Sequence, residues 1–324
     1  MRILSGIAPT GSVHLGSYLG AISQWKKLQE TNECLFFVAD LHALTIPQDP
    51  KDFPKQVINA AVELIACGLD PEKCIIFIQS EVKEHTELCW LLNTITPLGE
   101  MERMTQYKDK SKQFKDNVNA GLLDYPVLQA ADILLYQIDS VPVGQDQKQH
   151  LELTKNLAKK FNQKYGKTFK VPEPLILEFG AKIMSLQNPQ KKMSKSQPET
   201  CLFIFDEPEI IKKKIMSAVT DTGKAIKYDP DKKPGISNLL AIYSLISQKS
   251  ISELEKKFKN KGYGDFKKSL AELLILKLEP FRRKKKELLS REVYVKEILE
   301  RGRKRAQIIA VATMQDVRKK MGLS

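Results

Sequence analysis

Short apolar runs alternate with amphipathic segments through the first half of the chain, and this alternation limits the choice of fold. The runs at 3–7, 34–38 and 75–78 are typical of buried strands, and the segments at 18–28, 51–68 and 85–95 carry apolar residues at helical spacing. Strands that alternate with helices of this length favour a parallel sheet with helices on both faces. We therefore predict a doubly wound, Rossmann-like α/β fold, in which ligands bind beyond the carboxyl ends of the strands.

The connection between the first strand and the first helix has the composition of a phosphate site. Residues 9–17 read Pro-Thr-Gly-Ser-Val-His-Leu-Gly-Ser. Gly16 has no Cβ, so the backbone can approach a ligand there. The helix that follows begins with free N–H groups and a partial positive charge, to which His14 adds a donor. A plain strand-to-helix connection with a surface histidine is the alternative at this point.

Residues 125–136 place polar groups on an otherwise apolar helix. Tyr125, Gln129, Asp132 and Tyr136 are four, three and four residues apart, so they share one face. Pro126 predicts the first turn of this helix. Buried polar groups need partners, which lie either elsewhere in the protein or on a ligand. A second strand–glycine–turn–helix unit follows at 140–157, with Asp146 as the expected N-cap, and predicts another loop at the same crevice.

The charge distribution divides the chain in two. Residues 1–200 carry 23 basic and 23 acidic side chains, whereas residues 201–324 carry 29 basic and 16 acidic ones. We predict a catalytic domain over 1–200 and a helical domain over 201–324 that faces a polyanion such as RNA. The alternative explanation of the basic excess is that the helices of this region are lysine-rich on their solvated faces and bind no polyanion. The basic loop at 191–196 marks the boundary and has the composition to close over a polyphosphate.

Cysteine usage and hydropathy give expectations about the compartment. The five cysteines are odd in number and include no C-x-x-C pair, which argues against disulfide and zinc frameworks. No uncharged apolar run reaches the roughly 18 to 20 residues that a membrane span needs. We expect a cytoplasmic protein without a membrane partner.

Two short motifs connect these features to a known family. His14-Leu15-Gly16-Ser17 resembles the HIGH signature of class I aminoacyl-tRNA synthetases, and residues 192–196 match their KMSKS signature. The wider sequence resembles the tryptophanyl-tRNA synthetases in particular, over nearly the whole chain, in these stretches: 5–11, 102–106, 125–136, 141–144, 146–150 and 233–239. The resemblance implies a bacterial or organellar homodimer that activates L-tryptophan with ATP and Mg²⁺. The tryptophanyl-adenylate would then pass to the 3′-terminal adenosine of tRNA(Trp).

The same resemblance implies roles for individual residues and assigns none as a metal ligand. Asp132 would accept the indole N–H, while Tyr125 and Gln147 would hold the amino group. The other tryptophan-pocket residues would be His42, Gln129, Val141 and Val143. The catalytic residues would be His14, Ser17, Lys192 and Lys195. ATP would contact Ala8, Pro9, Thr10, Gly16, Ser17, Gly144, Gln145, Asp146, Ile183, Lys192, Met193, Ser194, Lys195 and Ser196.

Several positions depart from the family pattern and keep alternatives open. Ala8 stands where the family frequently has Gln, and Ser17 where it has His or Asn. Gln145 stands where the family frequently has Glu, and Gln197 where it has Asp. Gln129 and Asp132 resemble the Gln-x-x-Asp of tyrosyl-tRNA synthetases, so a tyrosine enzyme is one alternative. A nucleotidyltransferase without a tRNA partner and an inactive RNA-binding paralogue are two others. The paralogue would be expected to have lost the loop lysines, and both Lys192 and Lys195 are present.

Overall fold

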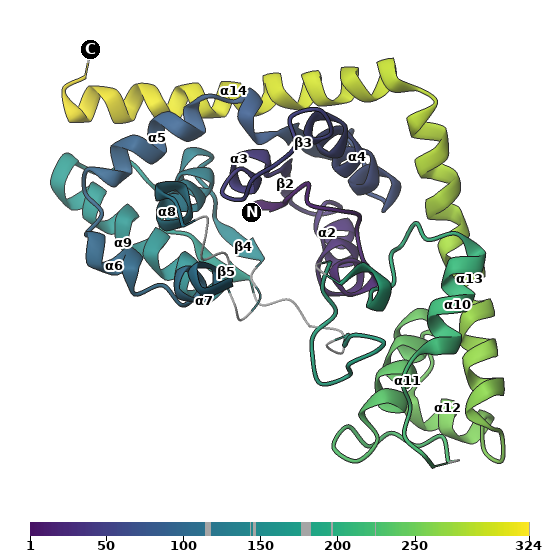
Figure 1. Ribbon diagram of the computed structural model, residues 1–324. Coiled ribbons are helices and arrows are strands. Elements are labelled where there is room, and N and C mark those ends of the chain that lie inside the picture. Colours follow the sequence, from purple (N-terminus) through teal and green to yellow (C-terminus); the bar gives the residue numbers. More distant parts are fainter. Residues whose placement is uncertain are drawn as a thin grey trace.

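A five-stranded parallel sheet forms the centre of the protein (Figure 1). The computed structural model describes residues 1–113, 118–142, 144, 147–175, 183–195, 197–223 and 225–323. The strand order is β3-β2-β1-β4-β5, and the strands are β1 (Arg2–Ile7), β2 (Glu33–Val38), β3 (Cys74–Ile78), β4 (Ser140–Pro142) and β5 (Glu173–Leu175). This confirms the predicted α/β class and four strands. The fifth strand was not predicted, since it is only three residues long and contains a proline.

Helices surround the sheet and continue into a separate helical region. Those up to residue 165 are α1 (Leu15–Ser17), a π-helical turn η1 (Tyr18–Ile22), α2 (Ser23–Leu28), α3 (Asp40–Ala43), α4 (Phe53–Ala66), α5 (Glu84–Asn93), α6 (Leu98–Glu102), α7 (Thr105–Gln113), α8 (Ala120–Leu135) and α9 (Lys148–Tyr165), with a 3₁₀ turn η2 (Gln79–Glu81). Later come η5 (Pro198–Thr200), α10 (Pro208–Ser217), α11 (Pro234–Ser247), α12 (Ile251–Lys257), α13 (Tyr263–Leu289) and α14 (Glu292–Met321). Among the described residues, no helix is long and apolar enough to cross a membrane.

Helix α8 begins earlier than the sequence predicted. Pro126 was expected in the first turn, but the helix starts at Ala120 and Pro126 lies inside it. The Asn119 side chain accepts a hydrogen bond from the Leu122 amide and so supplies the N-cap. The prediction was wrong because the N-cap asparagine, rather than the proline, marks where the helix begins.

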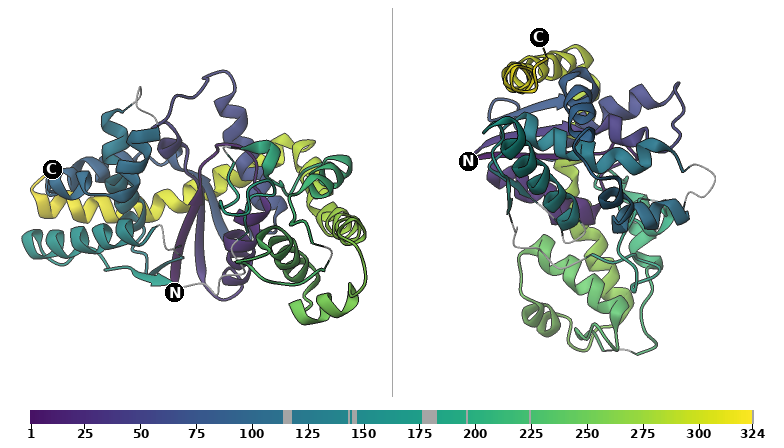
Figure 2. Two further views of the ribbon diagram at one scale, coloured as in Figure 1. Left: turned by 60° about the horizontal axis from the view of Figure 1, so that its bottom comes forward. Right: turned by 90° about the vertical axis from the view of Figure 1, so that its left-hand side faces the viewer.

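Helix α14 returns from the helical region to the sheet. In Figures 1 and 2 this helix runs beside β3 and α5, far from α11 and α12. Gly302 permits the contact, because a Cβ built on it would lie 1.8 Å from the Ile76 carbonyl oxygen of β3. The basic C-terminal segment therefore does not lie wholly within the helical region, and the domain boundary after residue 200 stays a prediction.

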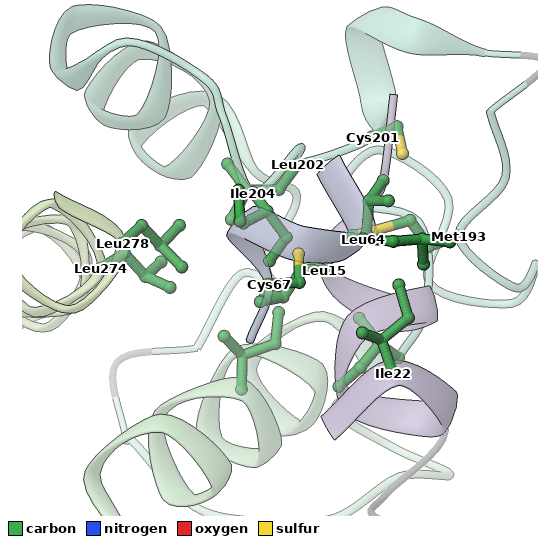
Figure 3. Packing of buried hydrophobic residues seen from close by; sticks show 14 of the residues in the cluster. Leu15, Ile22, Leu64, Cys67, Met193, Cys201, Leu202, Ile204, Leu274 and Leu278 are labelled. Carbon is green, nitrogen blue, oxygen red and sulfur yellow. The ribbon is translucent and has the colours of Figure 1, made fainter. Parts of the chain in front are cut away.

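One hydrophobic cluster joins the two regions. Figure 3 shows Leu274 and Leu278 of α13 directed towards Leu202 and Ile204. Leu15 of the first turn lies in the same cluster and is fully buried. The helical region is thus packed directly against the elements that carry the first turn.

We predict that Gly302→Ala destabilises the protein by about 1–3 kcal/mol or more, because the added methyl group cannot fit against the β3 backbone. Gly264→Ala is the matched control, since no atom lies within 4 Å of its added Cβ at the start of α13. Urea unfolding should show this control unchanged or more stable. Equal stability of the two variants would contradict the close packing of α14 on β3.

Candidate active site

A cavity of about 570 Å³ opens beside β1 and β2. The structure brings predicted residues from both substrate sets to its wall: Ala8, Thr10, His42, Tyr125, Gln129, Asp132, Val141 and Gln147. The sequence analysis did not select these further lining residues: Leu4, Ser5, Gly6, Phe37, Ala39, Ala43, Thr45, Ile46, Gln106, Lys110, Ile133, Pro142 and His150. The predicted crevice is therefore present, and it holds polar groups on an apolar wall.

Asp132 lies in the wall of this cavity and is only 1% exposed. Three side chains hydrogen-bond to its carboxylate. Gln79 Nε2 donates to Oδ1 at 2.7 Å, and His85 Nδ1 lies 2.6 Å from the same oxygen. His42 Nε2 lies 2.7 Å from Oδ2. Burial raises the pKa of Asp132, but the attraction and hydrogen bonds of the two histidines outweigh it and bring the pKa down to about 2. The carboxylate is therefore ionised at neutral pH.

His85 was missed by the sequence analysis because it begins a helix far from any motif. Its ring is fully buried, and its Nε2 lies 2.7 Å from the Tyr136 hydroxyl. Tyr136 was predicted to share the face of Asp132, and the two are joined through this histidine. The His85 ring therefore bridges the Asp132 carboxylate and the Tyr136 hydroxyl.

A second hydrogen-bonded group contains three of the predicted pocket residues. His150 connects them, with its Nε2 3.2 Å from the Tyr125 hydroxyl and its Nδ1 3.0 Å from Gln147 Oε1. Gln129 Nε2 donates to the same Gln147 oxygen at 3.3 Å. Lys110 lies with its ammonium 4.4 Å from the centre of the Tyr125 ring, and burial lowers the pKa of this lysine. His150 thus adds a polar group beside the Gln129 and Gln147 side chains, and Lys110 adds a cation beside Tyr125.

The first turn holds His14 as the N-cap of α1. Its Nδ1 accepts a hydrogen bond from the Ser17 amide at 3.1 Å, and its Nε2 lies 2.8 Å from Ser17 Oγ. Burial, with smaller contributions from Lys195 and Lys192, lowers the pKa of His14 to about 4. The neutral ring therefore carries its hydrogen on Nε2, which donates to Ser17 and leaves the hydroxyl hydrogen free to bind a ligand.

Two backbone N–H groups of this turn already donate hydrogen bonds within the protein, so fewer are available to a ligand than the sequence predicted. The Leu15 amide donates to the Leu202 carbonyl at 2.8 Å, and the Ser17 amide is used by His14. A Cβ on Gly16 would lie 3.1 Å from His14 Nδ1 and in ordinary contact with the Ile183 Cβ at 3.6 Å, so the His14 ring would have to shift slightly. An anion at this turn would therefore need side-chain donors as well as the helix N-terminus.

The basic loop lies against the first turn. Lys195 Nζ donates to the Gly11 carbonyl at 3.0 Å, and Gly11 has a φ of +81° that favours glycine. The Met193 side chain is buried, and its amide donates to the Ile183 carbonyl at 3.1 Å. Lys192 is exposed beside them. Lys195 of the second motif therefore contacts the loop that leads into the first motif, 184 residues away in the sequence.

The remaining predicted site residues lie elsewhere or are not described. Pro9 is buried, and Gly144 accepts a hydrogen bond from the Gln147 amide at 3.1 Å. Ser194 is exposed in the loop. Val143, Gln145, Asp146 and Ser196 lie outside the described residues, and so does the predicted N-cap at Asp146.

Basic residues are concentrated in two clusters of the C-terminal region, at 282–286 and 301–305, and both are partly engaged within the protein. Arg282 donates to the Ile275 and Asp206 carbonyls, and Lys285 pairs with Glu63. In the second cluster Arg301 pairs with Glu72, and Arg305 donates to the Cys74 carbonyl of β3. Only part of each cluster is therefore available for a polyanion.

Comparison with known proteins agrees with this arrangement. The family model of the class I tRNA synthetases for W and Y matches residues 1–279. The tryptophan–tRNA ligase of Caldanaerobacter subterraneus subsp. tengcongensis is 51% identical over 99% of this chain and 98% of its own length, and that of Helicobacter pylori is 52% identical over the same shares. A crystal structure of tryptophanyl-tRNA synthetase from Campylobacter jejuni, complexed with ADP and tryptophan, superposes with a TM-score of 0.88 at 38% identity and covers all of both chains.

The chain belongs to the family of class I tRNA synthetases for tryptophan and tyrosine. Within that family the two similar ligases just described are both tryptophan–tRNA ligases.

The depressed pKa of His14 predicts a pH-dependent stability. Between the pKa of about 6.5 in the unfolded chain and about 4 in the folded one, the unfolded state binds more protons. The free energy of unfolding should therefore fall as the pH falls, by about 2 kcal/mol at pH 5 from this residue. Urea unfolding of wild type and His14→Asn at pH 7.5 and pH 5 would measure it. A difference between the two proteins that does not change with pH would contradict a neutral, buried His14.

Proposed function

We propose that this protein is a tryptophan–tRNA ligase. It activates L-tryptophan with ATP to tryptophanyl-adenylate and pyrophosphate, and then passes the tryptophanyl group to the 3′-terminal adenosine of tRNA(Trp), which releases AMP. The observation that carries the proposal is the buried, ionised Asp132 in the wall of a cavity that also includes Ala8 and Thr10 of the first turn. The similar Campylobacter jejuni synthetase was crystallised with ADP and tryptophan, which supports an adenine nucleotide and tryptophan as substrates.

The adenylation step needs alignment and charge neutralisation. The tryptophan carboxylate is already ionised at neutral pH, so its oxygen attacks the α-phosphorus of ATP without a general base, and the bond to the pyrophosphate oxygen breaks. Lys192 and Lys195 would stabilise the negative charge that develops on the pyrophosphate. The Ser17 hydroxyl, whose oxygen accepts from His14, would donate a further hydrogen bond to a phosphate oxygen.

Other ATP contacts follow from the resemblance to the family. Gly16 and residues 8–10 would border the nucleotide, Gly144, Gln145 and Asp146 would hold the ribose, and Ile183 would lie near the adenine. Mg²⁺ would enter bound to the phosphates of ATP and would partly neutralise their charge. No group of three or more metal-ligating side chains occurs in the part of the chain that the structure describes.

The Asp132 carboxylate would determine which amino acid is activated. Its Oδ1 accepts from two donors, whereas Oδ2 accepts from His42 and retains one acceptor position. The indole N–H of tryptophan would occupy that position. Phenylalanine would leave it unpaired, and sites built to hydrogen-bond a substrate reject such analogues by roughly ten-thousand-fold.

The further partners are also proposals. A cytoplasmic homodimer would fit the family, and Trp90 and Leu98, which are 70% and 56% exposed, are available to a subunit contact. The basic face of the C-terminal helices would bind the tRNA, a partner implied by the synthetase class.

ATP–pyrophosphate exchange with tryptophan and with tyrosine tests the proposal. We expect exchange with tryptophan alone, and we expect Asp132→Ala to lower kcat/KM about 100-fold or more, since the variant loses the charged acceptor and leaves two histidines without their partner. Asp124→Ala, on the same helix but outside the cavity wall, is the matched control and should remain active. Exchange with tyrosine would move the assignment to the tyrosine enzyme, and exchange with neither would contradict ligase activity.

A further inference from the structure

We propose that Glu63 and Lys285 form a positioning pair for the first turn, so that the geometry of the ATP-binding residues depends on helix α13. The proposal rests on the proposed placement of the ATP phosphates at this turn. Neither residue belongs to a motif, and neither has a role in the chemistry described above.

Glu63 is a buried carboxylate that holds the first turn directly. It projects from α4 and is 1% exposed. Its Oε1 accepts from Ser12 Oγ at 2.5 Å, and its Oε2 accepts from the Val13 amide at 2.7 Å. These two residues immediately precede His14, so the carboxylate fixes the backbone from which the His14 and Ser17 side chains project.

Lys285 supplies the positive charge that this carboxylate needs. Its Nζ lies 2.6 Å from Glu63 Oε1, and its side chain is 18% exposed. The two residues are 222 positions apart, and the lysine comes from α13. The other short contact to Glu63 is from Asn59 on the same helix, at 3.1 Å. Lys285 is therefore the cation in direct contact with the Glu63 carboxylate.

The same part of α13 touches the first turn in two other ways. The Phe281 ring lies 5.1 Å from the Tyr18 ring in an edge-to-face arrangement. The Lys285 ammonium lies 4.6 Å from the centre of the Phe205 ring, which follows the segment that pairs with the turn. In that segment the Ile204 amide donates to the Val13 carbonyl at 3.0 Å. Helix α13 is thus connected to residue 13 through Glu63 and through the segment at 204–205.

Charge balance extends the effect to the basic loop. Burial lowers the pKa of Lys195, while the Glu63 carboxylate acts in the opposite direction. The carboxylate therefore attracts the ammonium that is proposed to bind pyrophosphate. Without Lys285, the uncompensated Glu63 charge would compete with the phosphates for Lys195, and this would weaken ATP binding in particular.

The experiment measures ATP–pyrophosphate exchange in Lys285→Met, Lys284→Met and the double variant Glu63→Gln/Lys285→Met. Methionine is unbranched like lysine and one atom shorter, so it keeps most of the apolar stem and removes the charge. We expect Lys285→Met to lower kcat/KM for ATP about tenfold, with the KM for tryptophan changed less than about twofold. The double variant should recover part of the loss, because no uncompensated charge remains and a glutamine can still accept from the Val13 amide. Lys284→Met, an exposed neighbour paired with Glu287, should match wild type.

Two outcomes would overturn the pair. One is a folded Lys285→Met protein with unchanged ATP parameters. The other is an equal loss of kcat/KM for ATP and for tryptophan, accompanied by a lower melting temperature and not recovered in the double variant. That result would make the pair purely structural. Should Lys285→Met not fold, Lys285→Gln, which also removes the charge, takes its place under the same criteria. Wild type without tryptophan-dependent exchange would instead refute the proposed function.

Discussion

The Asp132 carboxylate and its three donors are the interaction on which the proposed amino acid site depends. A charge with 1% exposure is costly unless it is fully compensated, and here the donors come from α3, η2 and α5 while the acceptor lies on α8. Four separate elements are consequently held around one wall of the cavity. The same arrangement leaves Oδ2 with one donor and Oδ1 with two, so under the proposed function the group that stabilises the site would also select the ligand.

The opposite end of the site follows a similar principle at the Glu63 carboxylate. Here the donors come from the first turn and from α13, and the charge lies beneath the residues proposed to hold ATP. The hydrophobic cluster of Figure 3 packs the same helix against Leu15 and Leu202. The first turn, where ATP is proposed to bind, is therefore connected to the helical region through both polar and apolar contacts.

Much of this arrangement could be predicted from the sequence, because the motifs and the alternation of strands and helices are local signals. The parallel sheet, the first turn and the clustering of Tyr125, Gln129 and Asp132 followed from spacing alone. His85, His150 and Glu63 could not be predicted, since each acts through a partner that is distant in sequence and becomes visible only when the chain is folded. The start of α8 was misplaced because Pro126 was given more weight than the N-cap Asn119. Likewise, charge alone could not show that Lys285 and Arg301 pair within the protein.

The central claim is that a hydrogen bond from the indole N–H to Asp132 selects tryptophan. Calorimetric binding of L-tryptophan and of its benzothiophene analogue, in which sulfur replaces the ring N–H at nearly the same shape, tests it directly. The account predicts that the analogue binds about 100-fold more weakly, because the buried carboxylate would lose a donor. Equal affinity of the two ligands would contradict it.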